Sequence, residues 1–238
     1  MKTIGLTDFF DKIKYDWNKD KEKIAKICEL TKTRVDLARD DFSFDYGSEQ
    51  VFLLKAIAEW KSADSFFEIG TGRGTACYTI SLCPHVEDIV TIDILPPTLK
   101  RQESVKYRSA DVSNMDLYEM VPYEEKNKIL FKHRSEVFQI INEYKDYFDL
   151  CFVDGNHDNK QIIMSDFEIC KNIMTSDGLI VWDDYDKTKY SVASVVDTIL
   201  KENENYDALL IEFRGHLFDS RKEKNAGIVL MKEGKFEF

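Results

Sequence analysis

A glycine-rich turn between two apolar strands constrains this chain more than any other feature. Residues 65–69 read Ser-Phe-Phe-Glu-Ile and lead straight into Gly-Thr-Gly-Arg-Gly at residues 70–74. A helical pattern follows, and a second apolar run ends in Asp93. A strand, a glycine turn, a helix and an acid at the next strand end together outline a nucleoside-binding pocket. The alternative is an ordinary strand-to-helix turn with Asp93 as a solvated strand end.

The spacing of the glycines narrows the class of nucleotide. A dinucleotide fingerprint has the form G-x-G-x-x-G, in which the third glycine lets the helix pack closely on the strand. Counted from Gly70 the third position is Thr75, and counted from Gly72 it is Cys77. The dinucleotide pattern therefore fails in both registers.

Apolar strands alternate with amphipathic helices along most of the chain, which is typical of a doubly wound parallel sheet. The expected strands are residues 65–70, 88–93, 129–133, 148–153, 178–183, 207–213 and 226–231. The expected helices are residues 7–18, 20–38, 48–61, 74–83, 135–145, 158–175 and 190–203. The predicted fold class is α/β, with a mostly parallel seven-stranded sheet.

The ends of the chain depart from simple alternation. Only about a dozen residues separate the last two strands, too few for the usual helical crossover, so they are expected to form an antiparallel hairpin. Residues 1–47 are expected to be a helical extension, and residues 48–238 a Rossmann-like domain. Whether the extension is a packing cap, a lid or an oligomer contact stays open. The proline-containing segment 95–127 is long, and part of it is expected near the active site.

Composition limits the partners and the compartment. The formal net charge of −11 argues against nucleic acid, because proteins that bind a phosphate backbone present clustered Lys and Arg. No stretch approaches the roughly 20 apolar residues of a membrane span, and the N-terminus lacks the apolar core of a signal peptide. The five cysteines lie mostly in apolar runs without C-x-x-C spacing, as buried thiols in a reducing compartment do. We expect a cytoplasmic protein with a small-molecule substrate, and its amphipathic extension is compatible with a homo-oligomer.

Acidic side chains follow two later strands. One apolar strand runs into Asp154-Gly-Asn-His157, and the next runs into Asp183-Asp184. The carboxyl ends of parallel strands lie at the same sheet edge as the glycine turn, so three carboxylates are expected to converge there. Crowded carboxylates repel one another, and a hard divalent cation is the commonest way to stabilise them. The sequence therefore predicts a Mg²⁺ or Ca²⁺ site; the alternative is helix caps and solvated strand ends.

The pattern E-x-G-x-G-x-G at residues 68–74 resembles the first motif of class I S-adenosylmethionine-dependent methyltransferases. In that family the glycines let the backbone approach the methionine part of the cofactor, and an acid matching Asp93 accepts hydrogen bonds from the ribose hydroxyls. Ser135 matches the place where relatives contact adenine, although Arg134 stands where an acid is frequent. The cofactor-binding residues that the resemblance implies are Glu68, Gly70, Thr71, Gly72, Gly74, Asp93, Ser135 and Asp154.

The later motifs make the resemblance more specific. F-D-L-C-F-V-D-G-N-H-D followed by D-G-L-I-V-W-D-D-Y is similar to the metal-dependent small-molecule O-methyltransferases, particularly the bacterial group that includes the macrolide-sugar enzymes. The resemblance covers residues 48–231 and implies Asp154, Asp183 and Asp184 as metal ligands. It implies His157 as general base, with Asp154 as the second catalytic residue. Such a role is chemically reasonable, because a cation acidifies a bound hydroxyl and imidazoles titrate near neutral pH.

The sequence differs from the catechol-type branch of this superfamily. That branch carries a lysine where this chain has His157, and Asp-Asn where this chain has Asp183-Asp184. A sugar or another aliphatic hydroxyl compound is therefore favoured over a catechol. Two rival interpretations stay open: the same scaffold used for another reaction such as hydroxylation, and a non-catalytic binding module.

Overall fold

The computed structural model describes residues 1–31, 35–36, 43–44, 49–100, 112–212 and 227–236. Eight strands of this part of the chain form one sheet: β1 (Lys2–Gly5), β4 (Ser65–Ile69), β5 (Asp88–Asp93), β6 (Ile129–His133), β7 (Phe148–Val153), β8 (Met174–Tyr185), β9 (Tyr206–Glu212) and β10 (Gly227–Glu233). Their order across the sheet is β1-β9-β10-β8-β7-β4-β5-β6. Two short strands, β2 (Val35–Asp36) and β3 (Ser43–Phe44), pair separately.

The sheet confirms the predicted mixture of parallel and antiparallel pairing. Strands β4 to β8 are parallel to one another, whereas β10 runs antiparallel to both β8 and β9. The expected count of seven strands was one short, because β1 pairs in parallel with β9 at the edge. Only four residues form β1, too few to produce a recognisable alternation of apolar and polar residues. The local sequence therefore did not predict its pairing with β9, a strand from the far end of the chain.

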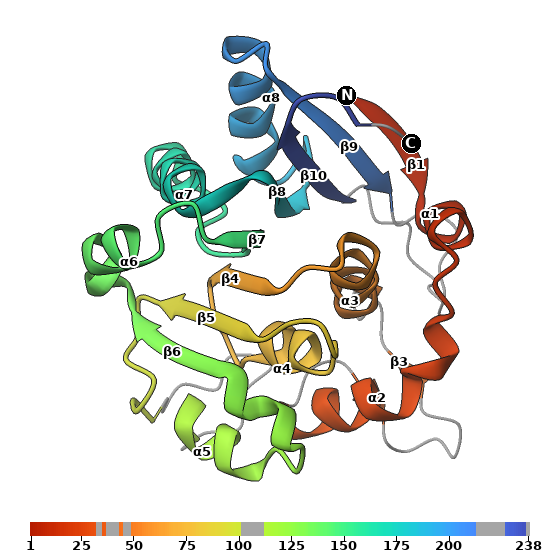
Figure 1. Cartoon of the computed structure of the whole chain (residues 1–238), viewed down its shortest axis with the longest axis vertical. Helices are drawn as coiled ribbons and strands as arrows, with labels where there is room; N and C mark the ends of the chain where they lie inside the picture. The colour runs from red at the N-terminus through yellow and green to blue at the C-terminus, as the bar shows by residue number, and fades with distance from the viewer. Residues whose placement is uncertain (32–34, 37–42, 45–48, 101–111, 213–226, 237–238) are drawn as a thin grey trace.

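Helices cover both faces of the sheet. They are α1 (Leu6–Ile13), α2 (Lys21–Leu30), α3 (Glu49–Lys61), α4 (Thr75–Ser81), α5 (Asn114–Met120), α6 (Val137–Glu143), α7 (Lys160–Ile173) and α8 (Val192–Glu202). In the described part of the chain, three 3₁₀ turns accompany them: η1 (Trp17–Lys19), η2 (Glu124–Lys128) and η3 (Arg134–Glu136). Figure 1 shows α6, α7 and α8 on one side of the sheet, and α2, α3 and α4 on the other.

Alternation along each strand builds two hydrophobic cores. Successive strand residues point to opposite faces, so Phe66 of β4 packs with the helices α3 and α4, whereas Phe67 packs with the α6 and α7 layer. All five cysteines are buried and free, as the sequence predicted. None of the helices in the described residues combines the length and apolar character that crossing a membrane requires.

The N-terminal helices are shorter than expected. The helix predicted over residues 20–38 ends at Leu30, and residues 35–36 lie in β2 instead. Arg73 donates from Nη1 to the carbonyl of Thr31 at 2.6 Å, and Thr75 donates to the Thr31 hydroxyl at 2.9 Å. The end of α2 is thus capped by side chains from the glycine turn and α4, a tertiary contact that helical periodicity does not contain.

The extension is held to the domain by a buried cation. The Lys55 side chain of α3 is 4% exposed and forms ion pairs with Asp20, at 3.0 Å, and with Glu59. Tyr15 donates its hydroxyl to the same Asp20 at 2.8 Å. Residues preceding α2 therefore pack directly on α3. The division of the chain between residues 47 and 48 stays a prediction.

Candidate active site

The glycine turn joins β4 to α4 in the middle of the sheet. Gly70 has a φ of +100°, and a Cβ at this position would lie 2.0 Å from the backbone oxygen of Asp154. The Gly70 N–H donates to the carbonyl of Ile92 at 2.9 Å. The turn therefore passes directly against the end of β7, and only a residue without a side chain fits there.

Asp93 ends β5 beside this turn, where the sequence placed it. Its Oδ2 accepts a hydrogen bond from the Gly72 N–H at 3.0 Å, and its Oδ1 accepts one from the Leu95 N–H at 3.0 Å. The carboxylate is partly exposed. Each carboxylate oxygen has more than one lone pair, so an acid fixed in this way can accept further hydrogen bonds from ligand hydroxyls.

Ser135 lies in η3, directly after β6, and is exposed. Its hydroxyl lies 2.7 Å from Nδ1 of His133, whose Nε2 lies 2.9 Å from the carbonyl of Ile94. His133 is also the register partner of Asp93. The structure therefore brings Ser135 to the same corner of the sheet as Asp93, through the side chain of His133.

Glu68 lies beneath the turn and not on its surface. The residue is 1% exposed, and its Oε2 accepts a hydrogen bond from the Thr91 hydroxyl at 2.5 Å. Burial raises the pKa of the Glu68 carboxyl to about 8, with the nearby charge of Asp93 adding to the rise and the Thr91 hydrogen bond opposing it. A carboxyl enclosed in this way supports the turn from below.

Acidic residues from β7 and β8 meet at the carboxyl edge of the sheet. Asp154, His157 and Asp184 each offer a ligand atom within 4.8 Å of the others. His157 Nδ1 lies 3.3 Å from Asp184 Oδ2, and His157 Nε2 lies 3.9 Å from Asp154 Oδ1. The sequence predicted the convergence of Asp154 and Asp184. It assigned His157 to a separate role, whereas the structure places the imidazole between the two acids.

Asp183 is not a member of this three-residue group, yet its negative charge raises the pKa of Asp154. Burial raises the pKa of Asp154 well above the ordinary value, and the charges of Asp183, Asp184 and Glu68 raise it further. The side chain of Gln50, in the first turn of α3, opposes this rise in the pKa of Asp154. Gln50 was missed by sequence reasoning, because no motif surrounds it.

Two backbone features hold this group in place. Asp184 has a φ of +52°, a left-handed conformation that is uncommon for residues other than glycine. The Ser191 N–H donates to the carbonyl of His157 at 2.9 Å, and the rings of His157 and Tyr190 lie 5.4 Å apart at their centroids. The connection between β8 and α8 therefore packs against the turn that carries His157. Tyr190 also had no sequence signal, since its partner comes from another strand end.

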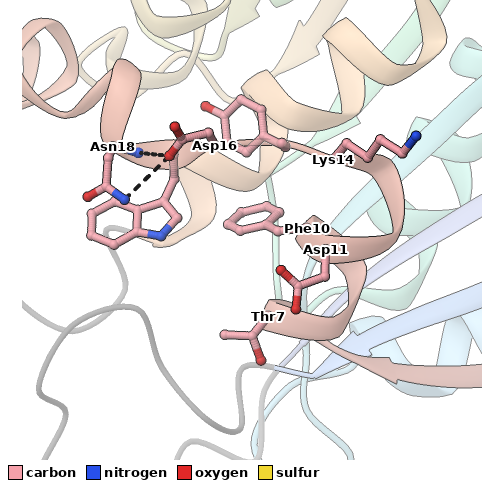
Figure 2. Close-up of a pocket in the computed structure, with 8 residues that line it drawn as sticks. Thr7, Phe10, Asp11, Lys14, Asp16 and Asn18 are labelled. Atoms are coloured by element: carbon pink, nitrogen blue, oxygen red, sulfur yellow. Dashed lines mark hydrogen bonds between the residues drawn. The ribbon is translucent and has the colours of Figure 1, made fainter.

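A separate hollow of about 410 Å³ lies between α1 and η1. Figure 2 shows Phe10, Asp11 and Lys14 around it, with Asn18 hydrogen-bonded to Asp16. All of its lining residues come from the N-terminal extension. It contributes no side chain to the strand-end site.

A family model places this Rossmann-like fold among the methyltransferases. The methyltransferase domain family matches residues 67–185, which run from β4 through the end of β8 and make up half of the chain. The chain belongs to this family and is an S-adenosylmethionine-dependent methyltransferase. No curated protein matches the sequence.

Solved structures with this fold include several O-methyltransferases. TomG from Streptomyces achromogenes, involved in tomaymycin synthesis and solved with S-adenosylmethionine, has a TM-score of 0.55 at 17% identity over 90% of this chain and 89% of that chain. An O-methyltransferase from Bacillus cereus, in complex with S-adenosylhomocysteine, has a TM-score of 0.58 at 12% identity over 95% and 96%. The Podospora anserina methyltransferase PaMTH1, also bound to S-adenosylhomocysteine, has a TM-score of 0.59 at 15% identity over 96% of each chain. At these identities the likeness concerns the fold.

Proposed function

We propose that this methyltransferase transfers a methyl group to a hydroxyl of a small molecule, such as a sugar or another aliphatic natural product, with a divalent cation. The observation that carries the proposal is the meeting of Asp154, His157 and Asp184 within 4.8 Å. The backbone of the first of these acids touches the glycine turn at Gly70. A methyl donor at the turn and an acceptor at the acids would therefore be neighbours.

The turn fits the proposed donor by its shape. Gly70 and Gly72 both have positive φ, and the space around Gly72 contains no atom within 4 Å of an added Cβ. The open side of the turn thus leaves room for a ligand at backbone distance, while Asp93 supplies a fixed acceptor for ribose hydroxyls. Ser135 is proposed to lie at the adenine end of the same pocket.

The acids fit a divalent cation by their donor atoms. Asp154 and Asp184 offer the carboxylate oxygens that Mg²⁺ and Ca²⁺ prefer, and His157 lies beside them as the proposed base. Like charges this close raise the pKa of Asp154, and a cation would relieve that repulsion. When bound, a divalent cation acidifies a hydroxyl that it contacts.

In this proposal, His157 takes the proton of the acceptor hydroxyl while the oxygen attacks the methyl carbon. The new O–C bond forms as the S–C bond of the sulfonium breaks, which leaves S-adenosylhomocysteine. Asp184 and Tyr190 orient the imidazole. Because methyl transfer is an in-line displacement, holding the two partners in register supplies much of the rate enhancement.

Binding and product formation test the donor assignment. Calorimetric titration with S-adenosylmethionine is expected to give a saturable heat, and incubation with a panel of sugars and other hydroxyl compounds is expected to release S-adenosylhomocysteine. Release of that product distinguishes methyl transfer from another reaction on the same scaffold. Absence of any binding heat up to millimolar donor would refute the proposal.

The metal assignment is tested separately. After dialysis against EDTA, titration with Mg²⁺ or Mn²⁺ is expected to show binding to the wild type, weakened more than about 10-fold by Asp154→Asn or Asp184→Asn. Asp186→Asn is the matched control, because its carboxylate bonds Thr188 in the same connection. The Asp183→Asn variant decides whether the third acid is a ligand. If Asp184→Asn binds the ion like the wild type, the metal site is wrong although methyl transfer can stand.

A further inference from the structure

Three buried polar side chains form a continuous chain of hydrogen bonds beneath the glycine turn. Glu68 of β4 lies directly opposite Thr91 of β5 in the sheet register. Thr91 Oγ1 donates to Glu68 Oε2 at 2.5 Å, and Thr71 Oγ1 lies 2.6 Å from Thr91 Oγ1. The exposed fractions are 1% for Glu68, 0% for Thr91 and 4% for Thr71. We call these three residues the threonine relay.

The direction of the relay follows from the hydrogens available. A hydroxyl carries one hydrogen, and that of Thr91 is directed at Glu68. The oxygen of Thr91 is therefore the acceptor for the hydroxyl of Thr71. Each hydroxyl thus donates its hydrogen to the next side chain, and the chain of hydrogen bonds begins at Thr71 in the glycine turn.

Thr71 is the residue of the turn whose side chain joins it to the buried part of the sheet. Its N–H donates to the carbonyl of Ile92 at 3.3 Å, and its own carbonyl accepts from the Gly74 N–H at 2.7 Å. The next residue, Gly72, directs its N–H at Asp93. With the side chain of Thr71 fixed from below, the backbone on either side has one orientation toward the ligand face.

Packing alone does not require hydroxyls at these positions. Valine has nearly the shape of threonine, and a buried hydroxyl costs free energy unless it is hydrogen-bonded. A core position in the middle of a parallel strand is ordinarily apolar. A threonine at position 91 is therefore explained by its two hydrogen bonds, one to Glu68 beneath the turn and one to Thr71 within the turn.

We propose that Thr91, which lies inside strand β5, is a positioning residue for the methyl donor and acts through Thr71 on the glycine turn. This inference rests on the proposed use of the turn as the donor site. Glu68 is the end of the relay that lies in β4, and Thr71 is the end that lies in the glycine turn. Loss of the Thr91 hydroxyl frees the turn while leaving the core filled.

The test compares Thr91→Val, Thr71→Val and the double variant, with Thr91→Ser as the conservative replacement. Thr79→Val is the matched control, because Thr79 is equally buried and its hydroxyl donates within α4, to the carbonyl of Thr75 at 2.8 Å. Two properties are measured on each folded protein: the affinity for S-adenosylhomocysteine by calorimetry, and the hydrogen-exchange protection of the amides of residues 70–74.

Each valine variant in the relay is expected to weaken binding about 10-fold and to lower amide protection in the turn. The double variant is expected to match either single variant, because all three break the same chain of bonds. Thr91→Ser and Thr79→Val are expected to behave like the wild type in both measurements.

Hydrogen exchange separates the two ways in which the idea can fail. If Thr91→Val leaves the protection of residues 70–74 unchanged, or lowers it no more than Thr79→Val does, the relay does not position the turn and the inference is wrong. If protection falls while the wild type itself binds no S-adenosylhomocysteine, the relay stands and the donor assignment fails. Additive losses in the double variant would also contradict a single connected relay.

Discussion

Replacing Gly70 by alanine is the sharpest test of how the glycine turn is built. The added Cβ would meet the backbone oxygen of Asp154 at 2.0 Å and its carbonyl carbon at 2.6 Å, so one of the two segments must move by about 1.4 Å or more to reach ordinary contact. The Asp154 N–H is bonded to the carbonyl of Ile69 at 2.9 Å, next to the substituted residue. Displacement of the turn therefore also displaces a carboxylate of the candidate metal site.

The magnitude follows from two separate costs. Overpacking a well-filled site costs about 1–3 kcal/mol, and a left-handed conformation costs a residue with a Cβ roughly 1–2 kcal/mol. Gly70→Ala is thus expected to lower the free energy of unfolding by about 2–5 kcal/mol. Gly72→Ala is the matched control, because it has a φ of +54° with nothing within 4 Å, and it should cost only the strain of about 1–2 kcal/mol.

Urea unfolding followed by far-UV circular dichroism measures both variants under the same conditions. In a domain of this size each kcal/mol corresponds to about 2–4 °C in the thermal midpoint, which gives a second measurement. Gly70→Ala is also expected to lose affinity for S-adenosylhomocysteine. The reasoning is refuted if Gly70→Ala is no less stable than Gly72→Ala, because the close contact with β7 would then impose no cost.

Three further substitutions test other buried groups. Burial raises the pKa of Glu68 from an ordinary value of 4.5 to about 8, so the folded state loses stability as the pH rises from 4.5 to about 8. Glu68→Gln should flatten that decline of the free energy of unfolding with pH. Identical pH profiles of the two proteins in urea titrations would contradict this prediction. Lys55→Met should lower the free energy of unfolding by about 1–3 kcal/mol, because its two acidic partners keep partial contact with water, whereas Lys26→Met on the surface should change the thermal midpoint little. Arg134→Met leaves the fully buried carboxylate of Asp166 without its ion pair, so it should lower the free energy of unfolding by about 3–5 kcal/mol. Adding Asp166→Asn should recover part of that loss, and a double variant no more stable than Arg134→Met would argue against the buried pair.

Local patterns were enough to place most of the secondary structure. The strand before the glycine turn was expected at residues 65–70 and is found at Ser65–Ile69, and the strand before Asp154 was predicted with its observed bounds. The terminal hairpin was predicted from the length of its connection, and β10 is antiparallel as expected. These features depend on residues close together in the sequence, where periodicity and connection length carry the information.

Other features arise from contacts between distant segments. The helix expected to continue to residue 38 ends at Leu30, because Arg73 of the glycine turn binds the carbonyl of Thr31. The edge strand β1 exists through its pairing with β9. Segment 95–127 was expected near the active site, but residues 101–111 lie outside the described part of the chain, so this expectation stays a prediction.

In the candidate site, too, some features follow from the local sequence and others from contacts between distant segments. The sequence by itself determined which chemical groups stand at the strand ends, since the acids and glycines follow directly after apolar runs. Only the tertiary structure decided how they meet: His157 lies between Asp154 and Asp184, and Glu68 lies beneath the turn, bonded to Thr91. The reason is physical. Strand ends are set by local patterning, whereas distances between side chains on different strands depend on register and packing, which a linear sequence specifies only through the whole fold.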